Sequence, residues 1–379
     1  MSGKPEVGIG IVGYGLMGRA HAYGYTLAPR IRDLPCTPRL RLISGRDDAA
    51  VASAAERYGV ERWTTDWGEV VTADQVDVVD VCTPPGTHAE IVEAAVRAGK
   101  AVLCEKPLAA DYASAARAAE AAAGAGVLNA TGFNYRRLPA ISLMKRLIDE
   151  GRIGEPRLWR AVWLSDEFLD PDIPFDWRFE RALGASTIAD LGSHLVDLAL
   201  WMIGDIDQVA AQSETFTRAR SGREVDVDEA SSALVRFSGG ARGVFEMARV
   251  APRRPCDFFV EVNGSSGTVH FDYPTLNELW FGDASDEDEL YGLRRIRAEH
   301  PTHPYAADWW PLGQGVGYGT SFVNQAADLL ERWPAGPWEP DLLQGARVQA
   351  VCEAIERSAS EGRWVAVTEV ASGRVPGPS

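Results

Sequence analysis

The sequence predicts an α/β protein of two domains: a doubly wound parallel sheet at the N-terminus, then an α+β domain with a largely antiparallel, open sheet. Three observations predict this class. Short apolar runs alternate with Ala-rich helical segments over the first third of the chain. A glycine-rich turn follows the first of these runs. Closely spaced strand candidates then replace the alternation. We place the domains at residues 1–133 and 134–379.

The N-terminal domain begins with a β-branched apolar run at 7–12, which is typical of a strand buried on both faces. A helix is expected at 16–27, followed by a proline-containing loop at 28–39. Further strands are expected at 40–44, 76–82, 101–104 and 127–133, and helices at 48–58, 88–98 and 111–124. This alternation predicts parallel strands with helices on both faces.

The second domain has a different rhythm. Helices are expected at 138–150 and, with an amphipathic pattern, at 188–203, and the segment 157–164 looks extended. Strand candidates follow at 209–216, 230–237, 242–248, 258–262, 268–271 and 278–281. Two helices, at 320–333 and 341–361, close the chain. Strands with so few helices between them favour an antiparallel sheet.

Composition excludes several classes of protein. The formal net charge is −16, which argues against nucleic acid or an anionic membrane as the main partner. Five cysteines without a Cys-x-x-Cys pair fit a reducing cytoplasm and offer no zinc framework. No signal peptide or transmembrane run is recognisable. His300 and His303 lack an obvious third ligand, so no metal is expected.

The first turn fits the pattern G-x-G-x-x-G and lies between a strand and a helix, the context that the dinucleotide-binding Rossmann motif requires. Its residues are Gly13, Tyr14, Gly15, Leu16, Met17 and Gly18. Gly13 permits the tight turn, Gly15 lets the backbone approach a pyrophosphate, and Gly18 allows helix and strand to pack closely. The alternative is an ordinary glycine-rich turn.

The tip of the second strand bears on the choice between NAD and NADP. An acidic residue there usually accepts from the ribose 2′-hydroxyl of NAD. This chain has Ser44, Gly45, Arg46 and Asp47. Arg46 can pair with a 2′-phosphate, which favours NADP. In the alternative interpretation Arg46 points to solvent and Asp47 reaches the ribose.

Two later turns end strands at the edge of the sheet where ligands of such folds bind. The first contains Thr83, Pro84 and His88, although a polar residue at a helix start is the simpler interpretation of His88. The second is Glu105-Lys106-Pro107. Lys106 there can stabilise an alkoxide, with Glu105 holding it in place, and the alternative is a surface lysine.

These motifs, together with Asp190-Leu191-Gly192-Ser193-His194-Leu195-Val196-Asp197, resemble the Gfo/Idh/MocA oxidoreductase family in order and spacing. The resemblance spans nearly the whole chain and implies the catalytic set Lys106, Asp190 and His194. Asp190 and His194 stand four residues apart, on one face of a helix, where a carboxylate can orient an imidazole. The expected cofactor-binding residues are Gly13, Gly15, Leu16, Met17, Gly18, Ser44, Gly45, Arg46, Thr83, Pro84, His88, Glu105, Lys106 and Asn134.

Asn134-Tyr135-Arg136-Arg137 and Asp176-Trp177-Arg178 look most like members acting on sugars and anhydrosugars, such as levoglucosan dehydrogenases. The expected substrate-binding residues are Tyr135, Arg137, Trp177, Arg178, Asp190 and His194. The expected function is hydride transfer between NAD(P) and a CH–OH or ketone group of a sugar, anhydrosugar or cyclitol. Alternatives are a redox-assisted glycosidase, a ketoreductase and a non-catalytic NAD(P)-binding regulator. We expect a cytoplasmic homodimer or homotetramer, because a large open sheet face needs covering.

Overall fold

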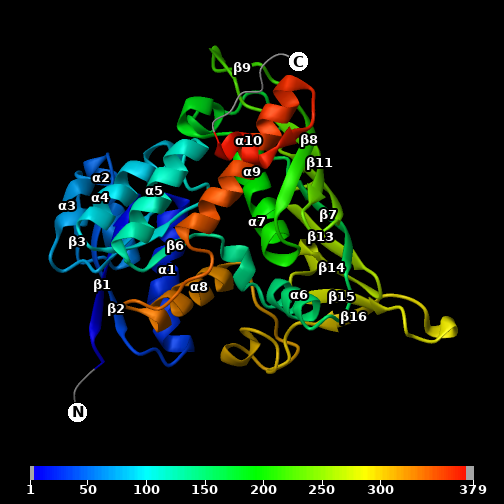
Figure 1. Cartoon of the computed structure of the whole chain (residues 1–379). Helices are drawn as coiled ribbons and strands as arrows, with labels where there is room; N and C mark the ends of the chain where they lie inside the picture. The colour runs from blue at the N-terminus through cyan, green and yellow to red at the C-terminus, as the bar shows by residue number, and fades with distance from the viewer. Residues whose placement is uncertain (1–3, 373–379) are drawn as a thin grey trace. The chain divides into compact units, whose positions relative to one another are not determined.

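The computed structural model of the chain describes residues 4–372, which form two compact units (Figure 1). The first unit holds the chain up to Arg137 together with Gly317–Ala346, and the second holds Leu138–Val316 and the chain from Arg347. The segment Gly317–Ala346 therefore returns to the first unit, whereas the sequence places everything beyond residue 133 in the second domain. No local pattern in a sequence reports such a return.

The first unit contains a six-stranded parallel sheet in the order β3-β2-β1-β4-β5-β6. Its strands are β1 (Glu6–Val12), β2 (Thr37–Ser44), β3 (Arg62–Thr64), β4 (Val78–Val81), β5 (Ala101–Cys104) and β6 (Asn129–Thr131). The order reverses at β1, so the predicted doubly wound sheet is confirmed. The short β3 was not predicted, because three residues carry no usable periodicity.

Helices cover this sheet. They are α1 (Leu16–Ile31), α2 (Asp48–Tyr58), α3 (Trp67–Thr72), α4 (His88–Arg97), α5 (Tyr112–Ala125), α8 (Gly319–Arg332) and the start of α9 (Leu342–Glu361). Asp111 caps α5, accepting from the Ser114 N–H at 2.8 Å. Helix α1 runs through Pro29, which was expected to lie in a loop. The interior is Val- and Ala-rich, as a sheet buried on both faces requires.

Helix α8 packs directly against α1 (Figure 1). The close approach requires Gly24, because a Cβ there would lie 2.6 Å from the Phe322 carbonyl oxygen. Thr131, at the end of β6, binds this C-terminal segment: the Thr131 N–H donates to the Pro340 carbonyl at 2.9 Å. These contacts explain why residues so late in the chain belong to the first unit.

The second unit is built on a nine-stranded sheet in the order β16-β15-β14-β13-β7-β12-β11-β8-β17. Its pairs are antiparallel except for β7 with β12, so the expected largely antiparallel sheet is confirmed. The strands are β7 (Pro156–Leu164), β8 (Ile206–Glu214), β11 (Ala230–Phe237), β12 (Arg242–Ala248), β13 (Asp257–Gly264), β14 (Gly267–Asp272), β15 (Glu278–Asp283), β16 (Arg294–Arg297) and β17 (Val365–Ala366). A separate ribbon pairs β9 (Ala219–Arg220) with β10 (Arg223–Glu224).

Helices α6 (Pro139–Asp149) and α7 (Ser193–Met202) pack on one face of this sheet, and α10 (Val367–Ala371) contacts β8 (Figure 1). The helix expected at 188–203 differs from prediction in two ways. Its first turn, Ile188–Gly192, is a π-helix, and nearly all of α7 is buried instead of one stripe. No helix among residues 4–372 is long and apolar enough to span a membrane.

Candidate active site

The glycine turn of the first unit fits a diphosphate. Gly13 has a φ of 109°, a region that favours glycine, and its N–H donates to the Ser44 carbonyl at 2.9 Å. A Cβ on Gly18 would lie 2.1 Å from the Gly13 carbonyl oxygen, whereas a Cβ on Gly15 would meet no atom within 4 Å. No side chain caps α1, so its N-terminal N–H groups face this open space.

At the tip of β2, Tyr14 covers Gly45 so closely that a Cβ would lie 2.0 Å from its ring. An acidic side chain therefore has no room at position 45. Asp47 caps α2, accepting from the Ala50 N–H at 2.8 Å, and Arg46 is exposed. Ser44 is buried and holds the turn through its carbonyl. Arg46 is thus an exposed cation beside the capped start of α2.

His88 does not occupy the place expected for a cofactor ligand. Its ring is completely buried, with Nδ1 2.9 Å from the Pro107 carbonyl and Nε2 2.6 Å from the Thr83 carbonyl. Burial lowers the pKa of His88. The side chain therefore ties the turn after β4 to the turn after β5. Its expected role in contacting the cofactor is corrected accordingly.

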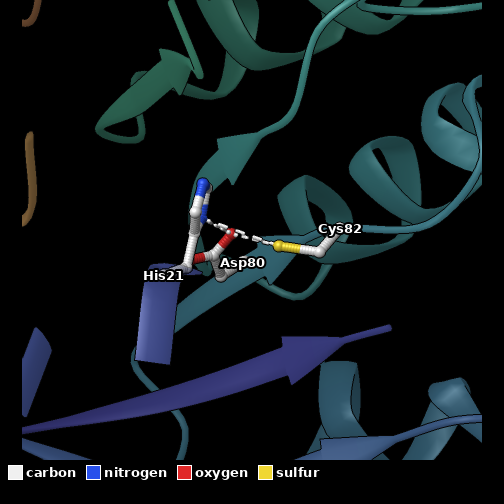
Figure 2. Close-up of side chains that lie close together, drawn as sticks. All are labelled: His21, Asp80 and Cys82. Atoms are coloured by element: carbon white, nitrogen blue, oxygen red, sulfur yellow. Dashed lines mark hydrogen bonds and ion pairs between the residues drawn. The ribbon is translucent and has the colours of Figure 1, made fainter. Parts of the chain in front are cut away.

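Glu105 belongs to a buried polar cluster with His21 and Asp80. Nε2 of His21 lies 2.9 Å from Oε1 of Glu105, and Nδ1 lies 2.9 Å from both carboxylate oxygens of Asp80. Figure 2 shows His21 and Asp80 facing each other, with the Cys82 thiol beside them. The other Glu105 oxygen accepts from the Lys106 N–H at 3.2 Å. The Lys106 side chain is partly exposed at this turn.

Three residues of the predicted Asn134–Arg137 group are held inside the first unit. Asn134 donates to the Ser321 hydroxyl at 2.8 Å, and the buried Tyr135 ring lies 5.8 Å from that of Tyr318. Arg137 donates to the Glu339 carbonyl at 2.5 Å, stacks on Trp338 at 4.3 Å and lies 3.3 Å from an Asp328 carboxylate oxygen. These contacts give Arg137 a structural role within the first unit, and its role in substrate binding stays a prediction.

In the second unit, the π-helical turn and α7 carry Asp190 and His194. The Asp190 N–H donates to the Ser186 carbonyl at 3.0 Å. The His194 ring stacks on Trp163 of β7, with centroids 5.4 Å apart, and its Nδ1 is buried. Inserted π turns recur at functional sites because they displace a side chain from the ordinary helical register.

Asp190 forms an ion pair with Arg249, which follows β12 and is almost completely buried. The guanidinium also lies 4.5 Å from the Phe168 ring. Burial lowers the pKa of Arg249 to about 10, while Glu167 opposes this shift and Arg178 adds to it. Arg178 itself stacks on Trp177 at 4.8 Å and pairs with Asp176 at 2.9 Å. Of the predicted residues Trp177 and Arg178, Arg178 thus acts electrostatically on the partner of Asp190.

Sequence reasoning missed His21, Asp80 and Arg249. A charged residue within the apolar strand at 76–82 was a usable signal for Asp80, because a buried carboxylate needs a partner. His21 faces the sheet one turn beyond Gly18, which also argued for burial. Arg249 carried no such signal, since a basic residue after a strand usually lies on the surface.

Among the described residues, His21, Asp80 and Cys82 offer ligand atoms within 4.8 Å of one another, a spacing that one metal ion can accept. Each of these groups already has a hydrogen-bond partner in the cluster. The Cys82 thiol donates to Asp80 at 3.3 Å, and burial raises the pKa of that thiol. A neutral thiol is a poor ligand, so the cluster fits hydrogen bonding better than metal binding.

A parallel sheet with an open glycine turn, followed by a domain that presents a carboxylate and an imidazole, defines a nucleotide-dependent oxidoreductase. Residues 7–133 match the model of the oxidoreductase family with an NAD-binding Rossmann fold, and residues 141–270 match the GFO/IDH/MocA C-terminal domain. The chain belongs to the Gfo/Idh/MocA oxidoreductase family.

Individual relatives agree with this assignment. Levoglucosan dehydrogenase of Pseudarthrobacter phenanthrenivorans is 32% identical, over 97% of this chain and 100% of the relative. A crystal structure of an oxidoreductase domain protein from Kribbella flavida is 43% identical, with a TM-score of 0.93 over 96% of this chain and 99% of that one. A levoglucosan dehydrogenase structure in complex with NADH and L-sorbose is 34% identical, with the same TM-score and coverages.

Proposed function

We propose that this oxidoreductase is a dehydrogenase that transfers hydride between a nicotinamide dinucleotide and a CH–OH group of a sugar, anhydrosugar or cyclitol. The observation that carries the proposal is the conjunction of an open glycine turn in the first unit with the Asp190 and His194 pair in the second. A regulator that only senses nucleotide needs no acid–base residues. The levoglucosan dehydrogenase relatives favour an anhydrosugar among these substrates.

The bound nicotinamide supplies the hydride acceptor, and the protein positions and exchanges the proton. We propose that His194 takes the hydroxyl proton at Nε2, because its Nδ1 is buried. Asp190, held by Arg249, orients the substrate hydroxyl and keeps negative charge near the imidazole. Lys106 stabilises the developing alkoxide with its ammonium group. Trp177 and Arg178 remain the candidates for binding the other hydroxyls of the substrate, with Tyr135.

For the dinucleotide, we infer a preference for NADP. The support is local: Gly45 excludes an acidic side chain, Asp47 is used as a helix cap, and Arg46 is exposed beside them. A guanidinium pairs well with a 2′-phosphate, whereas the Asp47 carboxylate already accepts the helix-capping hydrogen bond through one of its oxygens. Relatives with NADH bound make it necessary to measure both dinucleotides.

We also propose that the outer face of the second sheet pairs with a second copy of the chain. Leu234 of β11 and Val244 of β12 lie opposite each other in the sheet, and 53% and 37% of their surfaces are exposed. Leu158 of β7 is 55% exposed on the same sheet. Sedimentation should show an oligomer that Leu234→Lys weakens, and a wild-type monomer would contradict this proposal.

Free thiols at Cys36, Cys82, Cys104 and Cys256 support the expected cytoplasmic location.

The decisive experiment follows reduced-nicotinamide absorbance while the purified protein is mixed with NAD⁺ or NADP⁺ and a panel of anhydrosugars, sugars and cyclitols. Turnover of one class supports the proposal and names the substrate. His194→Ala and Lys106→Ala should then abolish turnover while dinucleotide affinity stays close to wild type. Tight dinucleotide binding without turnover of any substrate, in either direction, would favour a regulator, and net cleavage of a glycoside would favour the redox-assisted glycosidase.

A further inference from the structure

We propose that His21 is a positioning residue for hydride transfer: its imidazole links the buried carboxylates of Asp80 and Glu105 and thereby fixes the turn that carries Lys106. The catalytic part of this inference rests on the proposed function. The link itself rests only on contacts within the first unit.

The contacts form one continuous path. His21 lies in α1, Asp80 in β4, and Glu105 directly after β5. Nδ1 of His21 lies 2.9 Å from Asp80 and Nε2 lies 2.9 Å from Oε1 of Glu105, so each ring nitrogen has a carboxylate partner. Oε2 of Glu105 accepts from the Lys106 N–H at 3.2 Å. The path therefore runs from the helix of the glycine turn to the backbone of Lys106.

The side chains along this path are buried, and the residues around them leave room for the Glu105 carboxylate. The side chains of His21, Asp80 and Glu105 are 1%, 0% and 4% exposed, so water does not compete. The ring of Phe322 closes over His21 at 5.6 Å. A Cβ at Gly132 would lie 2.6 Å from Oε1 of Glu105, so only glycine leaves room for the carboxylate.

Electrostatics explain why the linking group is an imidazole. Two buried carboxylates repel each other and are costly to desolvate unless a cation pairs with both. An imidazolium has two N–H donors pointing in different directions, which suits two acceptors on opposite sides. Burial alone would lower the pKa of His21, but the Asp80 carboxylate beside Nδ1 raises it well above its usual value. The geometry, with one carboxylate at each ring nitrogen, favours the same charged form.

This arrangement gives Glu105 a specific task. Both of its oxygens have partners inside the protein, so we assign it to holding the turn instead of contacting the cofactor. In the proposed function, Lys106 acts on the substrate through its ammonium group. The position of that group depends on the position of the Lys106 backbone. A misplacement of about 1 Å in a catalytic group costs on the order of a hundredfold in rate.

A matched pair of variants tests the link. In His21→Asn the amide nitrogen replaces Nδ1, which keeps the Asp80 contact and removes the Glu105 contact. In His21→Gln the amide nitrogen replaces Nε2, which keeps the Glu105 contact and removes the Asp80 contact. Both variants lose the same positive charge, so a general loss of stability affects both.

We expect His21→Asn to lower kcat by about 10- to 100-fold at unchanged dinucleotide Kd. His21→Gln should regain most of that kcat. Equal kcat values in the two variants, at equal melting temperatures, would overturn the proposal. Stoichiometric zinc in the purified wild-type protein would also overturn it, because the His21 and Asp80 atoms would then be metal ligands.

A second measurement needs neither substrate nor cofactor. Nitrogen NMR of wild-type protein labelled in its histidine rings should show both His21 nitrogens protonated at neutral pH, assigned by the signal that His21→Gln removes. A neutral ring with one bare nitrogen would overturn the link. If no substrate is turned over, the proposed function fails, while the NMR result still decides whether His21 links the two carboxylates.

Discussion

Arg249 and Asp190 form an ion pair in which the arginine side chain is 2% exposed and the carboxylate 36% exposed. The cation is thus fixed in the interior, and the anion reaches toward solvent. A buried guanidinium is costly unless a carboxylate compensates it, so the pair constrains the direction of Asp190. Asp190 takes part in this pair from within the π-helical turn Ile188–Gly192.

The pair predicts a pH effect. Replacing Arg249 by Met removes the positive charge beside Asp190, and loss of an opposite charge disfavours the ionised form of a carboxyl group and so raises its pKa. The acid limb of kcat/KM against pH should therefore move to higher pH. Steady-state rates over a pH series measure this shift.

Arg249→Lys is the matched control, because it keeps the charge and loses only the planar geometry. Its acid limb should stay closer to that of the wild type, even if its rate is lower. An unchanged acid limb in a folded Arg249→Met protein would show that Asp190 does not depend on Arg249.

The glycine turn allows a second prediction that separates folding from binding. Gly18→Ala brings a methyl group to within 2.1 Å of the Gly13 carbonyl oxygen, so it should lower the free energy of unfolding by about 1–3 kcal/mol. Gly15→Ala meets no protein atom and should leave stability within about 0.5 kcal/mol of wild type.

The effect of Gly15→Ala should appear in binding. Its methyl group occupies the space into which the N-terminus of α1 opens and should displace a phosphate from a backbone N–H. Loss of one charge-assisted hydrogen bond, about 1.5–3 kcal/mol, weakens the dinucleotide Kd about tenfold or more. Unchanged affinity in a stable Gly15→Ala protein would mean that the diphosphate binds elsewhere.

Much of this site was accessible from the sequence because its signals are local. A glycine pattern between a strand and a helix needs no knowledge of the rest of the chain, and the structure gives Gly13, Gly15 and Gly18 the three local geometries expected of them. Asp190 and His194 were also chosen from a local pattern, and their pairing stays a prediction. The π-helical turn at Ile188–Gly192 departs from the ordinary helical register that the pattern assumes. Gly192 is tightly packed there, since a Cβ would lie 2.7 Å from the Met247 sulfur.

Two of the predicted site residues share a feature that a local sequence pattern does not report. His88 and Arg137 follow strands, where polar side chains often meet ligands, but both are buried and bonded to backbone carbonyls. Local sequence cannot separate a polar group that faces a ligand from one that joins two segments. Arg137 depends on Glu339 and Trp338, about two hundred positions later, and no spacing rule reaches that far.

The third prediction concerns the dinucleotide. If Arg46 pairs with a 2′-phosphate, Arg46→Ala should lower kcat/KM with NADP⁺ by about tenfold or more, because an arginine–phosphate pair is charge-assisted. With NAD⁺ the same variant should stay within about twofold of wild type. Initial rates with both dinucleotides give the ratio directly.

Asp47→Ala is the neighbouring control. It removes the cap on the Ala50 N–H and should cost about 1 kcal/mol of stability while affecting both dinucleotides equally. A selective loss of NAD⁺ turnover in Asp47→Ala would instead assign the ribose contact to Asp47 and contradict the NADP preference.

The last prediction follows from the raised pKa of His21. Below the usual histidine pKa of about 6.5, the ring is protonated in both the folded and the unfolded chain, and its stabilising contribution is complete. As the pH rises further, the unfolded chain releases this proton first, so the folded state binds more protons and stability falls with increasing pH. The contribution is lost once the pH passes the folded pKa.

Burial raises the pKa values of Cys82 and Tyr25, so both stay neutral over this range. Urea unfolding at a series of pH values should therefore show the stability difference between wild type and His21→Gln shrinking from about pH 6.5 upward. A difference that is constant or grows with pH would mean that His21 is not held as a cation between its two carboxylates.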